Sequence, residues 1–347
     1  MGRIKGGIGI ALLVSAVLAS ASACGGSASA SAGKLTGTTS TSSSPTAGST
    51  TNSTASAPST PTASPTPSAP PTTHPAGPAM LLNTIEPESG STVGVAMPVS
   101  IVFSNPVATS ARAGIEKAIQ ITTSVPVTGA WHWFSSTRVD WRPEKYWPAG
   151  TKVTVNANLD NVGDGHGRYG IHGYTHSFTV GADVETQVSA PNHSMKVYRN
   201  GTLVRSMPID AGSPQFPSWD GTMAVMDKAR EVRMTSCSVD ITCDPSNPNF
   251  YDITLPWDVQ LTTSGTYVHY STGDPSPGHS YGSHGCVHLS YSNAEWFYNY
   301  VEQGDPITIT GSPRGLAAGD NGYADFNLTW TQWLSASGTG AQTTTVS

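Results

Sequence analysis

Residues 267–290 read YVHYSTGDPSPGHSYGSHGCVHLS, and no other segment of the chain is as rich in reactive side chains. The stretch holds one cysteine, Cys286, and four histidines among several turn-forming residues. A thiol becomes a strong nucleophile only as a thiolate, and a histidine on a neighbouring strand is the usual base that takes its proton. His269 ends a short run with apolar flanks, which is typical of a strand. The pattern therefore predicts that Cys286 is the nucleophile and His269 its general acid/base.

The core of this stretch is Ser283-His284-Gly285-Cys286, and His269 lies seventeen residues before the cysteine. This motif resembles the signature of the L,D-transpeptidase catalytic domain of the YkuD type. The resemblance extends to residues 289–298, which are similar to the helix after the cysteine in mycobacterial-type members, and to residues 325–333, which are similar to their C-terminal tail. One position departs from the pattern, because His288 stands where the family mostly has Asn or Arg.

This resemblance implies an enzyme, a cysteine acyltransferase that forms 3→3 cross-links between the stem peptides of peptidoglycan. Cys286 would attack the carbonyl of the third stem residue and expel the terminal D-alanine. An amine of a second stem would then resolve the thioester. His269 would carry the proton from the thiol to the leaving amine, with its ring oriented by the Tyr270 carbonyl. Such a reaction needs no cofactor, and its partners are tetrapeptide stems of peptidoglycan.

The resemblance also assigns roles to residues around the nucleophile. Gly285 would let the chain turn tightly, and the backbone N–H groups of His284, Gly285 and Cys286 would stabilise the oxyanion. The residues expected to contact the substrate are Met234, Tyr251, Ser264, Gly265 and His288.

Other interpretations of the motif remain open. His284, Cys286 and His288 alternate, so on an extended segment they would share a face with His279 or His269 and could bind zinc. We expect no metal site, because the resemblance gives each residue a role without one. A wall-binding or spacer protein without turnover is a second alternative, although an intact Cys286 and His269 favour the enzyme. The same acyl-enzyme could also attach a protein or hydrolyse the stem.

The chain begins with the features of a secretory signal. Arg3 and Lys5 precede an apolar run that ends in Ala21-Ser-Ala-Cys24. Because the run is too short for a stable bilayer span, residues 1–23 are predicted to be a signal peptide. The ending resembles the bacterial lipobox and predicts a lipidated Cys24, with Ala21 where leucine is commonest. Cleavage without lipidation is the alternative.

Residues 24–79 consist almost entirely of Ser, Thr, Ala, Gly and Pro. They carry too little apolar surface to offset the entropy of ordering, so we expect a disordered linker whose ends lie on the order of 40 Å apart. With a lipid on Cys24, this linker predicts an exported protein that is held at the outer face of the cytoplasmic membrane and reaches into the cell wall.

The charge of the chain argues against nucleic acid as a binding partner. The chain has 17 Lys and Arg against 23 Asp and Glu, and no basic patch is visible. Nucleic acid is therefore not an expected partner, because affinity for phosphates comes from clustered Lys and Arg.

Cys237 and Cys243 are predicted to form a disulfide within the lid over the substrate, which suits an exported protein. A reduced pair or a metal site is the alternative.

Residues 80–182 are predicted to form an immunoglobulin-like β-sandwich. Short segments with alternating apolar residues, such as 99–103 and 153–159, are separated by clusters of Pro, Gly and Asn. Trp131 and Trp133 share a face and are expected in the core or at a domain interface. Three histidines of this region are expected at the surface or at strand edges: His166, His172 and His176.

Residues 183–311 are predicted to form a β-rich catalytic domain with one principal helix, followed by a C-terminal tail over residues 312–347. Asn200-Gly201 between alternating runs is a strong hairpin signal. Ser292-Asn-Ala-Glu295 has the pattern of a capping box, which would start the helix there. We expect the positive end of this helix to lower the pKa of the Cys286 thiol.

Overall fold

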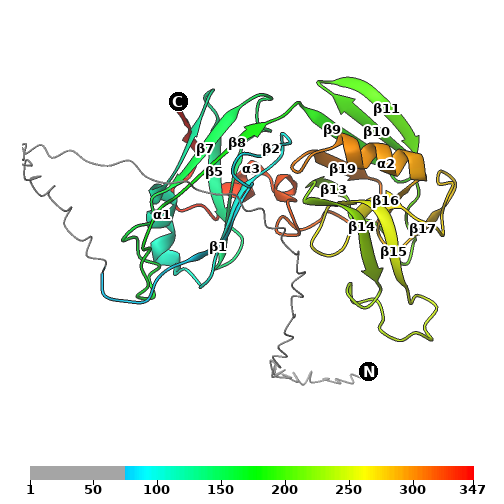
Figure 1. Cartoon of the computed structure of the whole chain (residues 1–347), viewed down its shortest axis with the longest axis horizontal. Helices are drawn as coiled ribbons and strands as arrows, with labels where there is room; N and C mark the ends of the chain where they lie inside the picture. The colour runs from blue at the N-terminus through cyan, green and yellow to red at the C-terminus, as the bar shows by residue number, and fades with distance from the viewer. Residues whose placement is uncertain (1–74) are drawn as a thin grey trace, which may run out of the picture. The chain divides into compact units, whose positions relative to one another are not determined.

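The computed structural model describes residues 75–347, and the predicted signal peptide, Cys24 and most of the predicted linker lie outside this range. The described residues are mostly β, as predicted, and their strands fall into two groups with separate hydrophobic cores (Figure 1). One core contains residues 80–180, and the other contains residues 184–324.

The first group of strands is a sandwich of two five-stranded sheets. The first sheet has the order β1 (Leu82–Glu86), β3 (Val99–Phe103), β6 (Arg138–Pro143), β5 (Thr128–Trp133) and β20 (Gln342–Thr343). The second sheet has the order β2 (Thr92–Val93), β8 (Tyr174–Val180), β7 (Lys152–Ala157), β4 (Ile119–Thr123) and β21 (Thr345–Val346).

The core of the sandwich confirms the alternation predicted from the sequence. Val99, Ile101 and Phe103 of β3 are buried, as are the alternating residues of β7. Trp131 lies opposite Trp141 on the neighbouring strand, and both rings are buried. The helix α1 (Thr109–Ala118) was not predicted. It is short, contains Gly114 and has no side-chain cap, so it lacks the usual signals of a helix.

The second group of strands forms the body that carries the predicted nucleophile. One sheet has the order β11 (Thr202–Pro208), β10 (Ser194–Arg199), β9 (Val184–Ser189), β19 (Pro306–Thr310) and β13 (Gly221–Ala224). A second sheet has the order β14 (Asp227–Thr235), β15 (Asp252–Gln260), β16 (Tyr267–Tyr270) and β18 (Val287–Leu289). A small parallel pair joins β12 (Ala211–Gly212) to β17 (Tyr281–Ser283).

Local turn chemistry explains the hairpin between β10 and β11. Asn200 and Gly201 both adopt positive φ angles, 50° and 74°, which a two-residue hairpin turn of this hand requires. The predicted hairpin is therefore confirmed.

The principal helix of this body, α2 (Tyr291–Tyr300), packs against β15, β16 and β18 and buries Ala294 and Phe297. The predicted capping box at Ser292 is wrong, because the N-cap residue is Ser290 and its side chain accepts no capping hydrogen bond. The helix begins earlier than predicted because Tyr291 and Ser292 already belong to its first turn.

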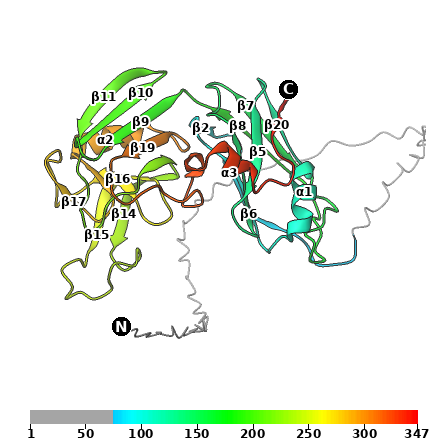
Figure 2. The same cartoon turned by 180° about the vertical axis from the view of Figure 1, so that it is seen from behind.

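The predicted tail is ordered and returns to the sandwich. It contains a 3₁₀ turn, η1 (Asp325–Asn327), and the helix α3 (Trp330–Leu334), before β20 and β21 (Figure 2). Trp333 is fully buried, and its Nε1–H donates to Ala130 O on β5 at 2.9 Å. His132 Nδ1–H donates to the carbonyl of Trp333 at 2.8 Å. β20 then pairs with β5 and β21 with β4, so one segment extends both sheets.

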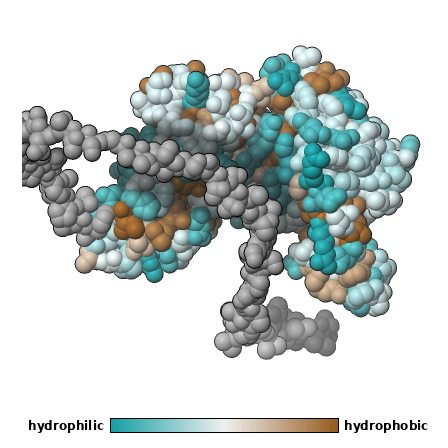
Figure 3. Space-filling view, viewed as in Figure 1, coloured by the Kyte–Doolittle hydropathy of each residue, from teal (hydrophilic) through white to brown (hydrophobic). Residues whose placement is uncertain are grey.

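The exposed surface mixes polar and hydrophobic side chains in small areas (Figure 3). Leu203 and Val204 of β11 are among the exposed large hydrophobic residues. Within residues 75–347, no helix is both long and apolar enough to cross a membrane.

Candidate active site

Two neighbouring parallel strands set the geometry around the predicted nucleophile. β16 and β18 pair so that His269 lies opposite His288, and Cys286 directly precedes β18. The two imidazole rings meet edge to face with centroids 5.0 Å apart. The strand register therefore brings the predicted base and the residue that departs from the family pattern into contact.

The His269 side chain is buried and held in one tautomer. Its Nδ1–H donates to the carbonyl of Tyr270 at 2.7 Å, as expected from the resemblance, which leaves Nε2 as a proton acceptor. Burial and the neighbouring His288 lower the pKa of His269 to about 3. The ring is therefore neutral at physiological pH and able to accept a proton.

Cys286 is half-buried, and its Sγ–H donates to the carbonyl of Gly265 at 3.7 Å. Burial raises the pKa of the Cys286 thiol to about 12, although the backbone N–H of Tyr267 opposes this shift. The net pKa of the thiol is therefore raised, and the predicted lowering by the α2 terminus stays a prediction that desolvation would outweigh. Among the described residues, no hydrogen bond joins Sγ to His269, but both side chains line one cavity.

Ser283 fixes the turn that presents Cys286, the predicted nucleophile. Its Oγ–H donates to Cys286 O at 2.6 Å and its Oγ accepts the Gly285 N–H at 3.1 Å. Gly285 has a φ of 120°, a conformation that side chains rarely tolerate. The predicted tight turn is present, but the Gly285 N–H is already occupied. His284 and Cys286 are the remaining candidates among the three predicted oxyanion donors.

Two cavities approach Cys286, and four residues line both of them: Met234, Tyr251, His284 and Cys286. The first cavity, of about 360 Å³, also contains Ser264, Gly265 and Arg314. The second cavity, of about 310 Å³, also contains His269, Asp274 and His288. Cys286 therefore lies on the wall of two cavities.

A chain of polar contacts continues from His288 away from the nucleophile. His288 Nδ1 lies 3.0 Å from Asp274 Oδ2. Burial, followed by the nearby Asp210 carboxylate, raises the pKa of Asp274 to about 6, and burial lowers the pKa of His288 to about 4. Above pH 6 the carboxylate therefore accepts a hydrogen bond from a neutral His288 ring.

Asp210 anchors the loop between β16 and β17. Its Oδ1 accepts backbone N–H groups from Gly278, His279 and Ser280 at 2.8–3.1 Å. Burial opposes ionisation of Asp210, but these donors and the Ser280 hydroxyl lower its pKa overall. The Asp210 backbone also pairs with His288, so one residue ties the loop to β18.

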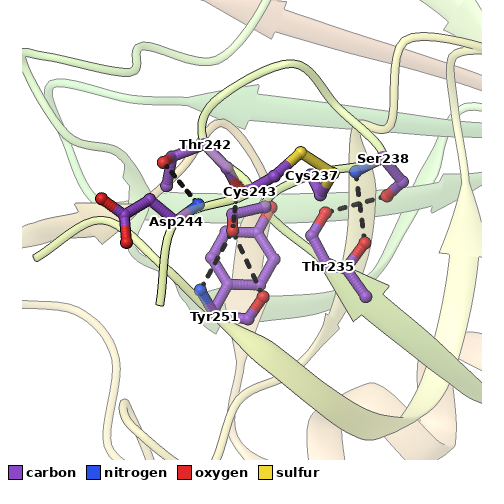
Figure 4. Close-up of a disulfide and its surroundings, with 8 residues drawn as sticks. Thr235, Cys237, Ser238, Thr242, Cys243, Asp244 and Tyr251 are labelled. Atoms are coloured by element: carbon purple, nitrogen blue, oxygen red, sulfur yellow. Dashed lines mark hydrogen bonds between the residues drawn. A yellow bond between two sulfur atoms is a disulfide. The ribbon is translucent and has the colours of Figure 1, made fainter. Parts of the chain in front are cut away.

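The segment between β14 and β15 covers both cavities and carries the predicted disulfide, Cys237–Cys243 (Figure 4). Ser236 Oγ–H donates to Thr242 O, and Ser236 Oγ accepts the backbone N–H of Tyr251. The Tyr251 ring lies 5.1 Å from the His284 ring. Disulfide and hydrogen bonds therefore hold Tyr251 over the nucleophile.

The zinc alternative has no ligand set in this structure. Within residues 75–347, no three His, Cys, Asp or Glu side chains are grouped so that they could hold a metal ion.

Comparison with known proteins identifies the two bodies separately. A family model of the bacterial Ig domain matches residues 22–163, and a model of the L,D-transpeptidase catalytic domain matches residues 183–309. L,D-transpeptidase 1 of Mycobacterium tuberculosis is 34% identical over 238 residues, which cover 68% of this chain and 88% of that protein. The chain belongs to the L,D-transpeptidase family.

Two further relatives extend the comparison within the L,D-transpeptidase family. L,D-transpeptidase 2 of Mycobacterium tuberculosis is 36% identical over 252 residues, which cover 72% of this chain but only 60% of that protein. The solved structure of LdtMt1 in complex with imipenem superposes with a TM-score of 0.58 and 34% identity, covering 67% of this chain and all of that one.

In this L,D-transpeptidase fold, eight of the predicted site residues line one or both cavities, and Gly285 adjoins them through the turn. Residues around the cavities that sequence reasoning missed are Asp210, Trp219, Asp274 and Arg314. Asp210 gave no signal, because its burial appears only in the fold. The others come from loops whose approach to Cys286 depends on tertiary contacts.

Proposed function

We propose that this chain is an exported L,D-transpeptidase that forms 3→3 cross-links between tetrapeptide stems of peptidoglycan through a Cys286 acyl-enzyme. The observation that carries the proposal is the placement of Cys286 and a neutral His269, with its Nε2 free, on one cavity. The catalytic-domain model and the mycobacterial relatives support the reaction class.

In the proposed first half-reaction, His269 Nε2 takes the thiol proton as Sγ attacks the carbonyl carbon of the third stem residue. The C–N bond to the terminal D-alanine breaks, and His269 returns the proton to the leaving amine. Because both groups are neutral at rest, proton transfer accompanies the attack rather than preceding it. The Cys286–His269 hydrogen bond forms with substrate bound, as catalytic hydrogen bonds often do.

In the proposed second half-reaction, an amine of another stem attacks the thioester and regenerates the thiol. The two cavities support this division, because Cys286 lines both of them. The N–H groups of His284 and Cys286 would stabilise both tetrahedral oxyanions, each worth about 3 kcal/mol in similar sites.

The proposed substrate contacts surround the thiol. Tyr251 and Met234 line both cavities and would cover the bound stems. Ser264 and Gly265 line the first cavity, where the Gly265 carbonyl is placed to accept an N–H from the stem once Sγ turns to the substrate.

His288 is proposed to accept a hydrogen bond from the substrate. The resemblance implies a hydrogen-bond donor at this position, where the family mostly has Asn or Arg. With Nδ1–H directed at Asp274, however, the neutral ring presents Nε2 as an acceptor. A protonated or N–H-bearing amine of the acceptor stem is a suitable partner for that nitrogen.

A carbapenem tests the nucleophile. The drug should add to the protein as a single adduct mapped to Cys286, and the adduct should be absent in Cys286→Ala. In His269→Ala its formation should slow by about 10²- to 10⁴-fold. His279→Ala, which removes an exposed histidine of the same loop, is the matched control.

If Cys286→Ala still acquires the adduct, Cys286 is not the nucleophile. If wild-type protein acquires none and leaves tetrapeptide stems unchanged, the spacer interpretation takes its place. Weighing the products formed from purified muropeptides then distinguishes cross-linking from hydrolysis and from attachment of a protein.

The proposed cellular arrangement follows from the N-terminal sequence. Residues 1–23 would be removed, lipid on Cys24 would anchor the chain, and residues 24–79 would act as the linker. Residues 80–182 and 183–311 would form the two domains, with 312–347 as the segment that joins them. Cys24→Ser should release the protein from the membrane fraction, whereas wild-type protein recovered wholly soluble, with a free N-terminus beyond Cys24, contradicts the anchor.

A further inference from the structure

The first cavity contains a cation whose role the proposed reaction has not used. Arg314, in the loop after β19, lines this cavity together with Cys286. Its guanidinium stacks on the Trp219 ring, with 3.8 Å between the guanidinium carbon and the ring centroid. Nη1–H donates to Pro217 O at 3.3 Å. Two separate contacts therefore fix the guanidinium at the cavity wall.

The guanidinium also lies beside the turn that presents the nucleophile. A Cβ atom built on Gly285 would lie 3.6 Å from Arg314 Nη1. Gly285 directly precedes Cys286, so the cation is close to the thiol without contacting it. Trp219 is itself held in place, because its Nε1–H donates at 3.1 Å to the Oγ of Ser264, which also lines the cavity.

The charges around this cavity are unbalanced. No Asp or Glu lines it, and its other cation, Arg233, is paired with both carboxylate oxygens of Asp252 at 2.7–2.8 Å. Within residues 75–347, no carboxylate lies within ion-pair distance of Arg314. A guanidinium that is fixed, accessible and unpaired is suited to bind a carboxylate through two N–H donors.

The proposed reaction supplies such a carboxylate close to the thiol. The residue that leaves is the last one of the donor stem, so its carboxylate is three bonds from the attacked carbonyl carbon, within about 4 Å. We propose that Arg314 binds the terminal carboxylate of the donor stem, and that this contact selects peptides ending one residue after the attacked carbonyl. This inference rests on the proposed function.

The consequence is a specificity for free C-termini. A stem that is one residue longer would place its carboxylate beyond Arg314, and a C-terminal amide would offer no charge. The second cavity, which contains Asp274 and three histidines, remains for the amine of the acceptor stem.

The test compares a synthetic tetrapeptide stem with the same peptide carrying a C-terminal carboxamide. For wild-type protein, we compare kcat/KM for release of the terminal D-residue from the two peptides. The value for the free acid should exceed the value for the carboxamide by about 10- to 100-fold. In Arg314→Gln this ratio should fall below about 3-fold, with the loss carried mainly by KM for the acid. Arg314→Lys should recover part of the preference.

Arg233→Gln is the control, because it removes an arginine of the same cavity whose guanidinium is already paired, and it should keep the preference. An Arg314→Gln variant that retains the preference, or that loses acid and amide turnover equally, overturns the inference. Equal turnover of both peptides by wild type overturns it as well. If wild type releases the terminal residue from neither peptide and forms no carbapenem adduct, the proposed function itself fails.

Discussion

Cys286 and His269 lie at the centre of the site. The thiol and the imidazole are both held in their neutral forms. Burial raises the pKa of the thiol to about 12 and lowers that of the imidazole to about 3. Such a pair differs from a preformed thiolate–imidazolium pair, in which the nucleophile is charged before substrate arrives. In the neutral pair, by contrast, neither group is charged before substrate arrives.

This protonation state predicts an unusual pH profile. The active form of the base is the neutral ring, which exists above the pKa, so a pKa of about 3 keeps His269 active throughout pH 5–8. The rate of Cys286 acylation by a carbapenem should therefore change less than about 3-fold between pH 8 and pH 5. A histidine with an ordinary pKa would lose about 30-fold over this range.

One group can still titrate within that window. Asp274, with a pKa of about 6, loses its charge as the pH falls and with it the charge-assisted bond to His288. A small step near pH 6 should therefore disappear in Asp274→Asn. A 30-fold fall centred near pH 6.5 in both proteins would show that His269 titrates normally.

Substitutions at His288 distinguish its role from that of the base, His269. His288→Asn should retain most activity, because an amide can accept the same hydrogen bond. His288→Ala should mainly raise KM for the acceptor stem, by about 10-fold, since it removes one polar contact. Steady-state kinetics at several acceptor concentrations measures this. Loss of acylation as complete as in Cys286→Ala would instead make His288 catalytic or a metal ligand, which metal analysis decides.

At the scale of elements, the segment between β14 and β15 controls access to the thiol. Its disulfide closes a short loop, and removal of both cysteines in Cys237→Ser/Cys243→Ser should lower the free energy of unfolding by about 2 kcal/mol. KM for the stem should also rise, because Tyr251 loses part of its support. Urea unfolding and peptide kinetics measure the two effects. Peptide mapping that finds both thiols free in exported protein contradicts the disulfide.

The elements also show what the sequence could predict. The hairpin at Asn200-Gly201 and the alternation in β3 and β7 follow from local chemistry, and the sequence was sufficient for both. The start of α2 was missed because Ser290 and Ser292 are equally plausible caps, and only the packing of the helix selects between them. The strands β20 and β21 have two residues each, too few for any periodicity, and they exist only because partners are supplied from far away in the chain.

The same distinction between local sequence chemistry and tertiary packing applies to the residues of the site. Cys286 and His269 were predicted because their chemistry is encoded in one short stretch. Arg314 and Trp219 lie 95 residues apart in sequence, and their stacking depends on how the loop after β19 packs. The raised pKa of the thiol could not be predicted from the motif, since burial of the thiol is a property of the assembled fold.

At the scale of the whole molecule, the segment after β19 ties the catalytic body to the sandwich. Arg142 Nη2–H donates to Leu328 O, and its guanidinium stacks on the rings of Phe326, Trp330 and Trp333. Trp333→Ala should lower the free energy of unfolding by about 3–5 kcal/mol, because it removes a fully buried aromatic ring and its hydrogen bond.

Trp330→Ala is a suitable comparison, since this ring belongs to the same helix but is only partly buried, and it should cost about 1 kcal/mol. Denaturant unfolding followed by circular dichroism measures both variants. Equal effects at the two positions would mean that α3 contributes little to the core of the sandwich.

The two short strands that end this segment, β20 and β21, complete the two sheets of the sandwich. Residues 184–310 are inserted between two parts of one immunoglobulin-like module, since β4 and β5 receive their outer neighbours only from residues 342–346. The contact between Thr123 and Thr344 spans 221 residues. During synthesis, the immunoglobulin-like module emerges first. One edge of each of its sheets, at β5 and at β4, therefore stays unpaired until the catalytic body has been made, and the module is completed last.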